Sequence, residues 1–182
     1  MQEEFLFSGF GGQGVMFVGQ LLAYAGMAEG LHVTWIPSYG PEMRGGTAHC
    51  FVILSDKEIG SPVVRYPRTG IVFNLPSFDK YESEIAPGGL LVVNSSLINK
   101  QITRADIEAL YVPATGIADE LGELKMANIV MLGALLTARP VLPLAAIRKA
   151  LAGHMPAHRR HLLERNFTAL ERGASVSLQP TR

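Results

Sequence analysis

Three glycines near the amino terminus have the spacing of a phosphate-binding turn. Gly9, Gly11 and Gly14 form the pattern G-x-G-x-x-G between a short apolar run and a stretch of helical periodicity. Glycine allows a tight turn and close approach of a ligand to the backbone, and the following helix presents unpaired N–H groups at its N-terminus. The run therefore predicts a place for a phosphate or another anion. The alternative is that the glycines only let the helix pack closely on a sheet.

The second half of a dinucleotide-binding fingerprint is missing. Such domains carry an acidic residue at the end of the second strand, about 20 residues after the glycines, to bind a ribose hydroxyl. Here that strand is predicted to end in Thr34-Trp35-Ile36-Pro37, without Asp or Glu. A stand-alone NAD-dependent dehydrogenase is therefore disfavoured.

Gln13, inside the glycine turn, is not needed for packing, and its amide is a candidate for contact with a ligand or a partner's backbone.

A second run of special residues, from Ser38 to Gly46, follows the same strand. Ligands and partners of an open α/β sheet bind at the carboxyl ends of its strands, so this loop is a candidate contact surface. Arg44 can hold a carboxylate or phosphate through two N–H groups, or it can pair internally with Glu42. Tyr39 adds apolar contact area. The candidate binding residues of the two runs are Gly9, Gly11, Gly12, Gln13, Gly14, Tyr39, Glu42, Arg44, Gly45 and Gly46.

The composition disfavours several other kinds of site. The 16 basic and 16 acidic residues balance, so no net field favours nucleic acid or an anionic membrane. The single cysteine, Cys50, cannot form an internal disulfide or ligate an iron–sulfur cluster alone, and we interpret it as core filler. We expect no metal site, because Pro156 separates His154 from His158. Without a signal-peptide start or a membrane-spanning run, the expected location is the cytoplasm.

The elements that must position these residues alternate along the chain. Apolar periodicity predicts strands at about residues 4–8, 31–36, 47–55, 70–75, 90–94 and 109–112, and helices at about 12–30, 76–85, 118–138, 144–151 and 158–171. This order favours an α/β, Rossmann-like fold with a mostly parallel sheet, helices on both faces and extra helices at the C-terminus. Residues 1–182 are predicted to form one domain, with about ten frayed residues at the end.

The motifs together resemble the gamma subunit of the pyruvate/2-oxoglutarate/2-oxoisovalerate:ferredoxin oxidoreductase family. The resemblance extends from about residue 5 to about residue 136. It rests mainly on Gly9-Phe10-Gly11-Gly12-Gln13-Gly14 and Tyr39-Gly40-Pro41-Glu42-Met43-Arg44-Gly45-Gly46. Shorter matches are Ile59-Gly60-Ser61-Pro62, Pro87-Gly88-Gly89, Asn94-Ser95-Ser96 and Lys125-Met126-Ala127-Asn128, which leads into Gly133-Ala134.

The resemblance implies a function within a larger enzyme. Members of this family decarboxylate a 2-oxoacid on thiamine diphosphate with Mg²⁺, transfer the acyl group to coenzyme A and pass electrons through iron–sulfur clusters to ferredoxin. Alpha and beta subunits build the thiamine site, and the clusters lie in beta or delta. The gamma subunit packs on these chains, and in fused members the equivalent domain helps to hold coenzyme A. No complete active site is therefore expected in this chain.

Two alternatives remain open from the sequence. The chain can be a stand-alone nucleotide-binding oxidoreductase, which the missing acidic residue disfavours. It can also be a purely structural assembly module, in which the glycines serve packing and the second loop serves an interface. A homo-oligomer of the isolated chain is compatible with either alternative. Which 2-oxoacid the enzyme uses would be decided largely by the partner chains.

Overall fold

The computed structural model describes residues 1–40 and 46–176. Its strands are β1 (Gln2–Phe10), β2 (His32–Tyr39), β3 (Thr47–Ser55), β4 (Thr69–Val72), β5 (Leu90–Asn94) and β6 (Glu108–Val112). Its α-helices are α1 (Val15–Ala28), α2 (Leu75–Tyr81), α3 (Ala114–Glu120), α4 (Ala127–Ala138), α5 (Leu144–His154) and α6 (Leu163–Ala174). Short 3₁₀ helices are η1 (Glu82–Glu84), η2 (Leu124–Met126) and η3 (Ala157–Leu162).

The six strands form one sheet in the order β2-β3-β1-β4-β5-β6. Strands β1, β4, β5 and β6 pair in parallel, whereas β3 is antiparallel to both of its neighbours, β1 and β2. The predicted mostly parallel α/β sheet is therefore confirmed, with one reversed strand. The reversal follows from chain length, because the short connection between β2 and β3 suits a hairpin, while a parallel pair needs a crossover of a dozen or more residues.

Several predicted bounds were wrong. The strand predicted at 70–75 ends at Val72, because Asn74 already caps α2. The helix predicted at 118–138 is divided into α3 and α4, because Gly122 leaves the helical conformation with φ 77°.

The end of β2 was predicted too early, before Pro37. Strand β2 continues through this proline to Tyr39, and Pro37 pairs with Cys50 of β3. Proline is tolerated here because β2 is the edge strand of the sheet, so a missing N–H on the open side breaks no ladder bond. The predicted frayed end lies partly outside the described residues, which reach Val176 with α6 ending at Ala174.

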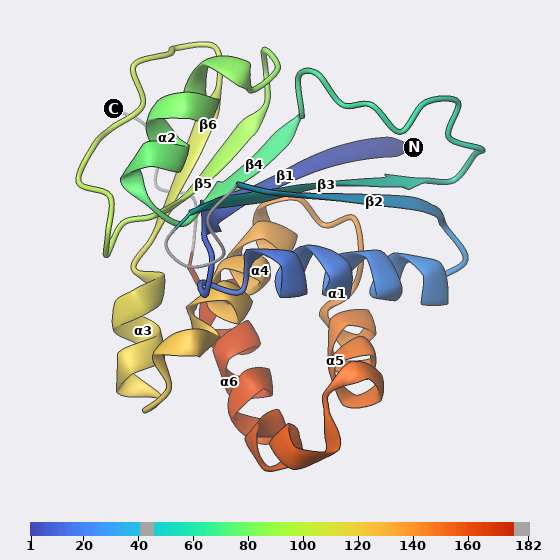
Figure 1. Ribbon diagram of the computed structural model, residues 1–182, viewed down its shortest axis with the longest axis vertical. Coiled ribbons are helices and arrows are strands. Elements are labelled where there is room, and N and C mark those ends of the chain that lie inside the picture. Colours follow the sequence, from blue (N-terminus) through green and yellow to red (C-terminus); the bar gives the residue numbers. More distant parts are fainter. Residues whose placement is uncertain (41–45, 177–182) are drawn as a thin grey trace.

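Helices cover both faces of the sheet, as predicted (Figure 1). On one face α2 packs through Phe78 and Tyr81 onto Leu6 of β1 and Leu91 of β5. The other face carries the larger core, with α1 and α4 against the sheet and α3, α5 and α6 farther out (Figure 1). The helix α1 therefore lies on the same face of the sheet as the C-terminal helices.

Two glycines allow α4 and α6 to cross in close contact. A Cβ atom added to Gly173 of α6 would lie far inside van der Waals contact with the carbonyl oxygen of Val130 in α4, and 2.7 Å from its carbonyl carbon. A Cβ added to Gly133 of α4 would meet the carbonyl group of Leu170 in the same way. The two backbones therefore touch directly, and this contact holds the C-terminal helices against the rest of the fold.

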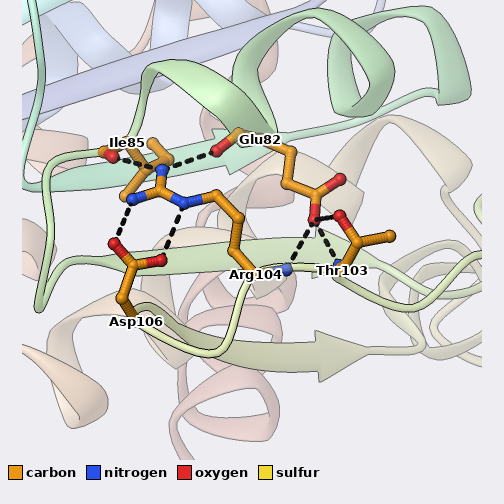
Figure 2. Close-up of polar contacts among 5 residues, drawn as sticks. All are labelled: Glu82, Ile85, Thr103, Arg104 and Asp106. Carbon is orange, nitrogen blue, oxygen red and sulfur yellow. Dashed lines mark hydrogen bonds and ion pairs between the residues drawn. The ribbon is translucent and has the colours of Figure 1, made fainter.

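A polar clamp fixes the long connection between β5 and β6 (Figure 2). The guanidinium of Arg104 donates to the carbonyl oxygens of Glu82 (3.1 Å) and Ile85 (2.5 Å) and, with two N–H groups, to the carboxylate of Asp106 (2.9 and 2.6 Å). In return, Glu82 accepts hydrogen bonds from the backbone and hydroxyl of Thr103. The clamp thus ties residues 103–106 to the end of α2 and η1.

Among the described residues, no helix has both the length and the apolar character needed to span a membrane.

Candidate functional site

The glycine turn joins the end of β1 to the start of α1 and is shaped by different constraints at each glycine. At Gly9 an added Cβ would lie 2.6 Å from Gln13 Oε1 and 2.9 Å from Phe73 Cβ, so this position requires glycine for packing. Gly12 has φ 99° and Gly14 has φ 75°, in the left-handed region that favours glycine. No atom lies within 4 Å of the Cβ position of Gly12, so the space beside it is open.

Gln13 is engaged inside the protein. Its Oε1 accepts hydrogen bonds from the backbone N–H of Phe10 (2.7 Å) and from Nδ2 of Asn74 (3.2 Å), and its Nε2 donates to the carbonyl oxygen of Phe73 (3.5 Å). These contacts link the glycine turn to the segment after β4. The observed role of the Gln13 amide is therefore to fix the turn, whereas the sequence pointed to an outward contact.

The two glycine-rich runs meet at the carboxyl ends of the strands. The N–H of Gly11 donates to the carbonyl oxygen of Gly46 (3.0 Å), and the N–H of Gly40 donates to that of Thr47 (2.8 Å). Tyr39, at the end of β2, is 69% exposed beside this junction. Of the other predicted residues, Glu42, Arg44 and Gly45 lie outside the described residues.

The strand order explains why the ribose-binding acid is missing. In a dinucleotide-binding fold that acid lies at the end of the strand beside β1. Here β3, running in the opposite direction, occupies that place, and its first residues Thr47 and Ala48 lie opposite Phe10 and Gly9. The position next to the glycine turn is therefore formed by the start of a strand, with no carboxylate.

A groove of about 590 Å³ opens beside the glycine turn. The N-terminus of α1 faces it: the N-cap Gly14 provides no side-chain hydrogen bond, and no acidic residue lies in the first helical turn. Free N–H groups and the positive end of the helix dipole favour an anion at such a position. The described lining residues are Phe10, Gly11, Gly12, Gly14, Val15, Met16, Phe17, Tyr39, Ala48, Lys125, Met126, Asn128, Met155, Pro156, Arg159 and Asn166.

The opposite wall of the groove contains residues that were not predicted as site residues. Lys125 of η2, Asn128 of α4 and Arg159 of η3 all line it. Asn128 Nδ2 donates to the carbonyl oxygen of Gly14 (3.2 Å), which fastens α4 to the start of α1. Lys125 and Asn128 belong to a run that carried the family resemblance, so a signal existed for them. Arg159 lies in the basic run His158-Arg159-Arg160-His161, which the sequence favoured as a solvated helix face over an anion site.

Two further reactive side chains, Cys50 and His49, are not among the described residues that line the groove. Burial raises the pKa of the Cys50 thiol to about 12, which matches the expected role of core filler. Burial, together with the nearby charge of Lys80, lowers the pKa of His49, whose ring packs against Phe51 and Tyr81. Across residues 1–40 and 46–176, no three His, Cys, Asp or Glu side chains gather in an arrangement suited to a metal ion.

Comparison with known proteins identifies the family. Residues 4–176 match the family described as pyruvate ferredoxin/flavodoxin oxidoreductase. The chain belongs to this family. The fold is similar to a solved structure, the gamma subunit of a keto/oxoacid ferredoxin oxidoreductase from Geobacter sulfurreducens. The two chains are 29% identical, with a TM-score of 0.80 over 94% of this chain and 95% of that one.

Two proteins of named function are similar to this chain in sequence. The ketoisovalerate oxidoreductase subunit VorA of Methanothermobacter thermautotrophicus is 41% identical over 129 residues, which are 71% of this chain and 27% of VorA. The 2-oxoglutarate synthase subunit KorC of Methanocaldococcus jannaschii is 33% identical over 97% of this chain and 95% of KorC. The chain thus spans about a quarter of the length of VorA and nearly all of KorC.

Proposed function

We propose that this chain is the gamma subunit of a thiamine-diphosphate-dependent 2-oxoacid:ferredoxin oxidoreductase. Such an enzyme converts a 2-oxoacid and coenzyme A to acyl-CoA and CO₂ while ferredoxin is reduced. The observation that carries the proposal is the family match over residues 4–176, and the similar relatives are subunits of ketoisovalerate and 2-oxoglutarate enzymes. The substrate of the whole enzyme is accordingly a 2-oxoacid of this class.

The cysteine content of this chain supports the view that other subunits bind the iron–sulfur clusters. Iron–sulfur clusters are held by several cysteine thiolates, whereas this chain has one cysteine, which is buried and keeps its proton. The clusters are therefore assigned to the beta or delta subunits. As the family resemblance implies, thiamine diphosphate and Mg²⁺ are assigned to the alpha and beta subunits. The same proposal places the assembled complex in the cytoplasm.

The groove beside the glycine turn supports a role in holding coenzyme A, which supplies the thiol that accepts the acyl group. Its phosphates match the free N-terminus of α1 and the cationic side chains of Lys125 and Arg159. Exposed Tyr39 adds apolar contact at the junction of the two runs. The residues proposed to face coenzyme A or a partner are Gly11, Gly12, Gly14, Tyr39, Glu42, Arg44, Gly45 and Gly46, whereas Gly9 and Gln13 shape the turn from inside.

Co-expression with candidate alpha and beta chains tests the proposal. We expect a stable complex that reduces ferredoxin only when both a 2-oxoacid and coenzyme A are present. If a preparation of alpha and beta without this chain kept full coenzyme-A-dependent turnover, the proposal would fail. The variant Arg44→Ala separates binding from assembly: a higher KM for coenzyme A in an intact complex supports the binding role, and loss of assembly with unchanged KM supports a purely structural module.

A further inference from the structure

A long connection, residues 56–68, joins β3 to β4 and is bonded to the rest of the chain only near its ends. It forms no helix or strand, and Figure 1 shows it on the same side of the sheet as α2. From Lys57 to Tyr66, no backbone-to-backbone hydrogen bond joins it to another described residue. Long connections without secondary structure of their own are usually functional. This one includes Ile59-Gly60-Ser61-Pro62, a part of the family resemblance that the groove leaves without a role.

Large apolar side chains on this side of the molecule face solvent. Within the connection, Val63 is 78% exposed and Tyr66 is 53% exposed. Strand β2 adds Ile36, which is 39% exposed. Ile36 lies on the α2 side of the sheet because it is opposite Phe51, which packs against the core cluster under α2. Exposed apolar side chains that share one side of a molecule are typical of a protein interface.

The sheet is unevenly covered on this side. Helix α2 packs on β1 and β4, and Figure 1 shows no helix over β2 and β3 on the α2 side within the described part of the chain. On the opposite side, the same two strands are covered by α1. The α2 side of β2 and β3 is therefore left to the connection and to a partner that binds there.

The exposed part of the connection is stiff and has side chains suited to binding. Pro62 and Pro67 bracket it, and proline fixes the backbone φ angle. The guanidinium carbon of Arg65 lies 5.3 Å from the centre of the Tyr66 ring, so the two side chains stack. A segment that is already held in one conformation loses less entropy on association. Tyr and Arg are also enriched among the residues that dominate binding energy.

The charge of this segment indicates the kind of partner. The sequence from Ile59 to Arg68 contains no Asp or Glu. Arg65 and Arg68 are exposed, and neither forms an ion pair within residues 1–40 and 46–176. Two cations among apolar side chains do not make the basic stripe that nucleic acid requires. Small ligands bind in concave sites, whereas this segment is exposed. A protein surface with an apolar centre and nearby carboxylates fits both the apolar and the cationic side chains.

We propose that Ile36, Val63, Arg65, Tyr66 and Arg68 form a docking surface for a partner subunit of the enzyme. The partner's matching surface has an apolar hollow for Val63 and Tyr66 and carboxylates beside the two arginines. The inference rests on the proposed function, since the partner belongs to the enzyme that this chain joins. It adds which side of the chain that partner covers. This docking surface is separate from the groove beside the glycine turn, whose described lining includes none of the five residues.

Site-specific cross-linking in the assembled complex identifies what covers the docking surface. Photoreactive benzoylphenylalanine is placed at position 63 and, as a control, at position 27. Met27 is 61% exposed on α1, which packs on the opposite side of the sheet. The expected result is a covalent product with an alpha, beta or delta chain from position 63, in clearly higher yield than from position 27. A product with a second copy of this chain, equal yields from both positions, or no product would overturn the proposal.

Affinity measurements test the chemistry of the docking surface. In biolayer interferometry against the co-purified alpha and beta chains, Tyr66→Ala should weaken binding by about thirtyfold, the effect of losing one dominant aromatic side chain. Arg65→Gln should weaken it by about tenfold. The controls Met27→Ala and Lys149→Gln change exposed residues of α1 and α5 and should bind like the parent chain. Equal weakening by the controls would contradict the docking surface.

Two further readings exclude trivial causes. Each variant should unfold at the temperature of the parent chain, because exposed side chains contribute little to stability. Added salt should weaken binding of the parent chain more than binding of Arg65→Gln, because salt screens a pair between Arg65 and a carboxylate. The same salt dependence in both chains would contradict the proposed carboxylates.

The outcomes also separate this inference from the proposed function. A chain that never binds alpha and beta chains contradicts both. A complex that assembles and reduces ferredoxin, yet tolerates Tyr66→Ala and gives no product from position 63, contradicts the docking surface alone.

Discussion

The crossing of α4 and α6 allows a quantitative test of how the C-terminal helices are held. The perturbation is Gly173→Ala, which adds one methyl group where α6 touches the carbonyl group of Val130. The neighbour is backbone, so no side-chain rotation can relieve the overlap. The two helices must separate by about an ångström to restore ordinary contact distances.

Two opposing terms set the size of the effect. Alanine is a better helix former than glycine by about 1 kcal/mol, which stabilises the folded state. Overpacking a close contact costs about 1 to 3 kcal/mol, and contact with rigid backbone favours the upper part of this range. The net expectation is a loss of about 2 kcal/mol in the free energy of unfolding. For a chain of this size that corresponds to a fall in Tm of roughly 4 to 8 °C.

Urea denaturation followed by circular dichroism measures this loss, and Gly153→Ala provides the matched control. Gly153 lies in α5 with no atom within 4 Å of its Cβ position, so the same substitution there should be neutral or stabilise by up to about 1 kcal/mol. The stability changes of the two variants differ in sign because Gly173 is packed against backbone and Gly153 is not. A Gly173→Ala variant as stable as the parent chain would refute the reasoning, because it would mean that the helices do not touch at this point.

Three further predictions concern single side chains. Gln13→Leu should destabilise the fold by about 1 to 3 kcal/mol in urea denaturation, because it leaves the N–H of Phe10 and the side-chain NH₂ of Asn74 unpaired. Gln13→Glu keeps the acceptor and should cost less, and equal losses in the two variants would contradict the assigned contacts. The Cys50 thiol should resist iodoacetamide at pH 8 in the folded chain, as judged by mass spectrometry. Its pKa of about 12 in the folded chain exceeds the unfolded value, so the free energy of unfolding should fall as pH rises from about 9 to 12, and this fall should be larger than in the Cys50→Ala variant. Arg104→Ala should lower the urea midpoint more than Lys100→Gln, which breaks only the exposed pair with Asp79; the reverse order would argue against the clamp of Figure 2.

Much of the fold was predictable because buried strands and amphipathic helices leave local patterns. Strand β5 was predicted with its observed bounds, Leu90–Asn94, and the strand at 47–55 was also found as predicted. The reversed direction of β3 was not foreseen, since the apolar pattern of a strand reads the same in both directions. Only the length of the preceding connection carries that information. The extension of β2 through Pro37 depends on its edge position, which no local pattern shows.

The site was predictable only in part, because several of its contacts join residues that are distant in the sequence. The glycine turn is a local signal, and its meeting with the second run followed from their shared place at the ends of strands. Besides Phe10, the partners of Gln13 are Phe73 and Asn74, some 60 positions along the chain, so its inward orientation depends on tertiary structure. Arg159 reaches the groove because α6, which packs against α4, is preceded directly by η3. Residue type alone could not distinguish it from its neighbour Arg160, which does not line the groove.

The position of β3 between β1 and β2 also constrains the order in which the chain can fold during synthesis. The β2–β3 hairpin is local and can form once Ser55 has left the ribosome, and it supplies the strand on which β1 pairs. The α4 helix, which packs on the same face of the sheet as α1, begins only at Ala127. A nascent chain of intermediate length therefore exposes part of an apolar sheet face while the roughly 70 residues between Ser55 and the start of α4 are added, about 4 to 14 s at typical translation rates. Exposed apolar surface of this kind is prone to aggregation during that interval.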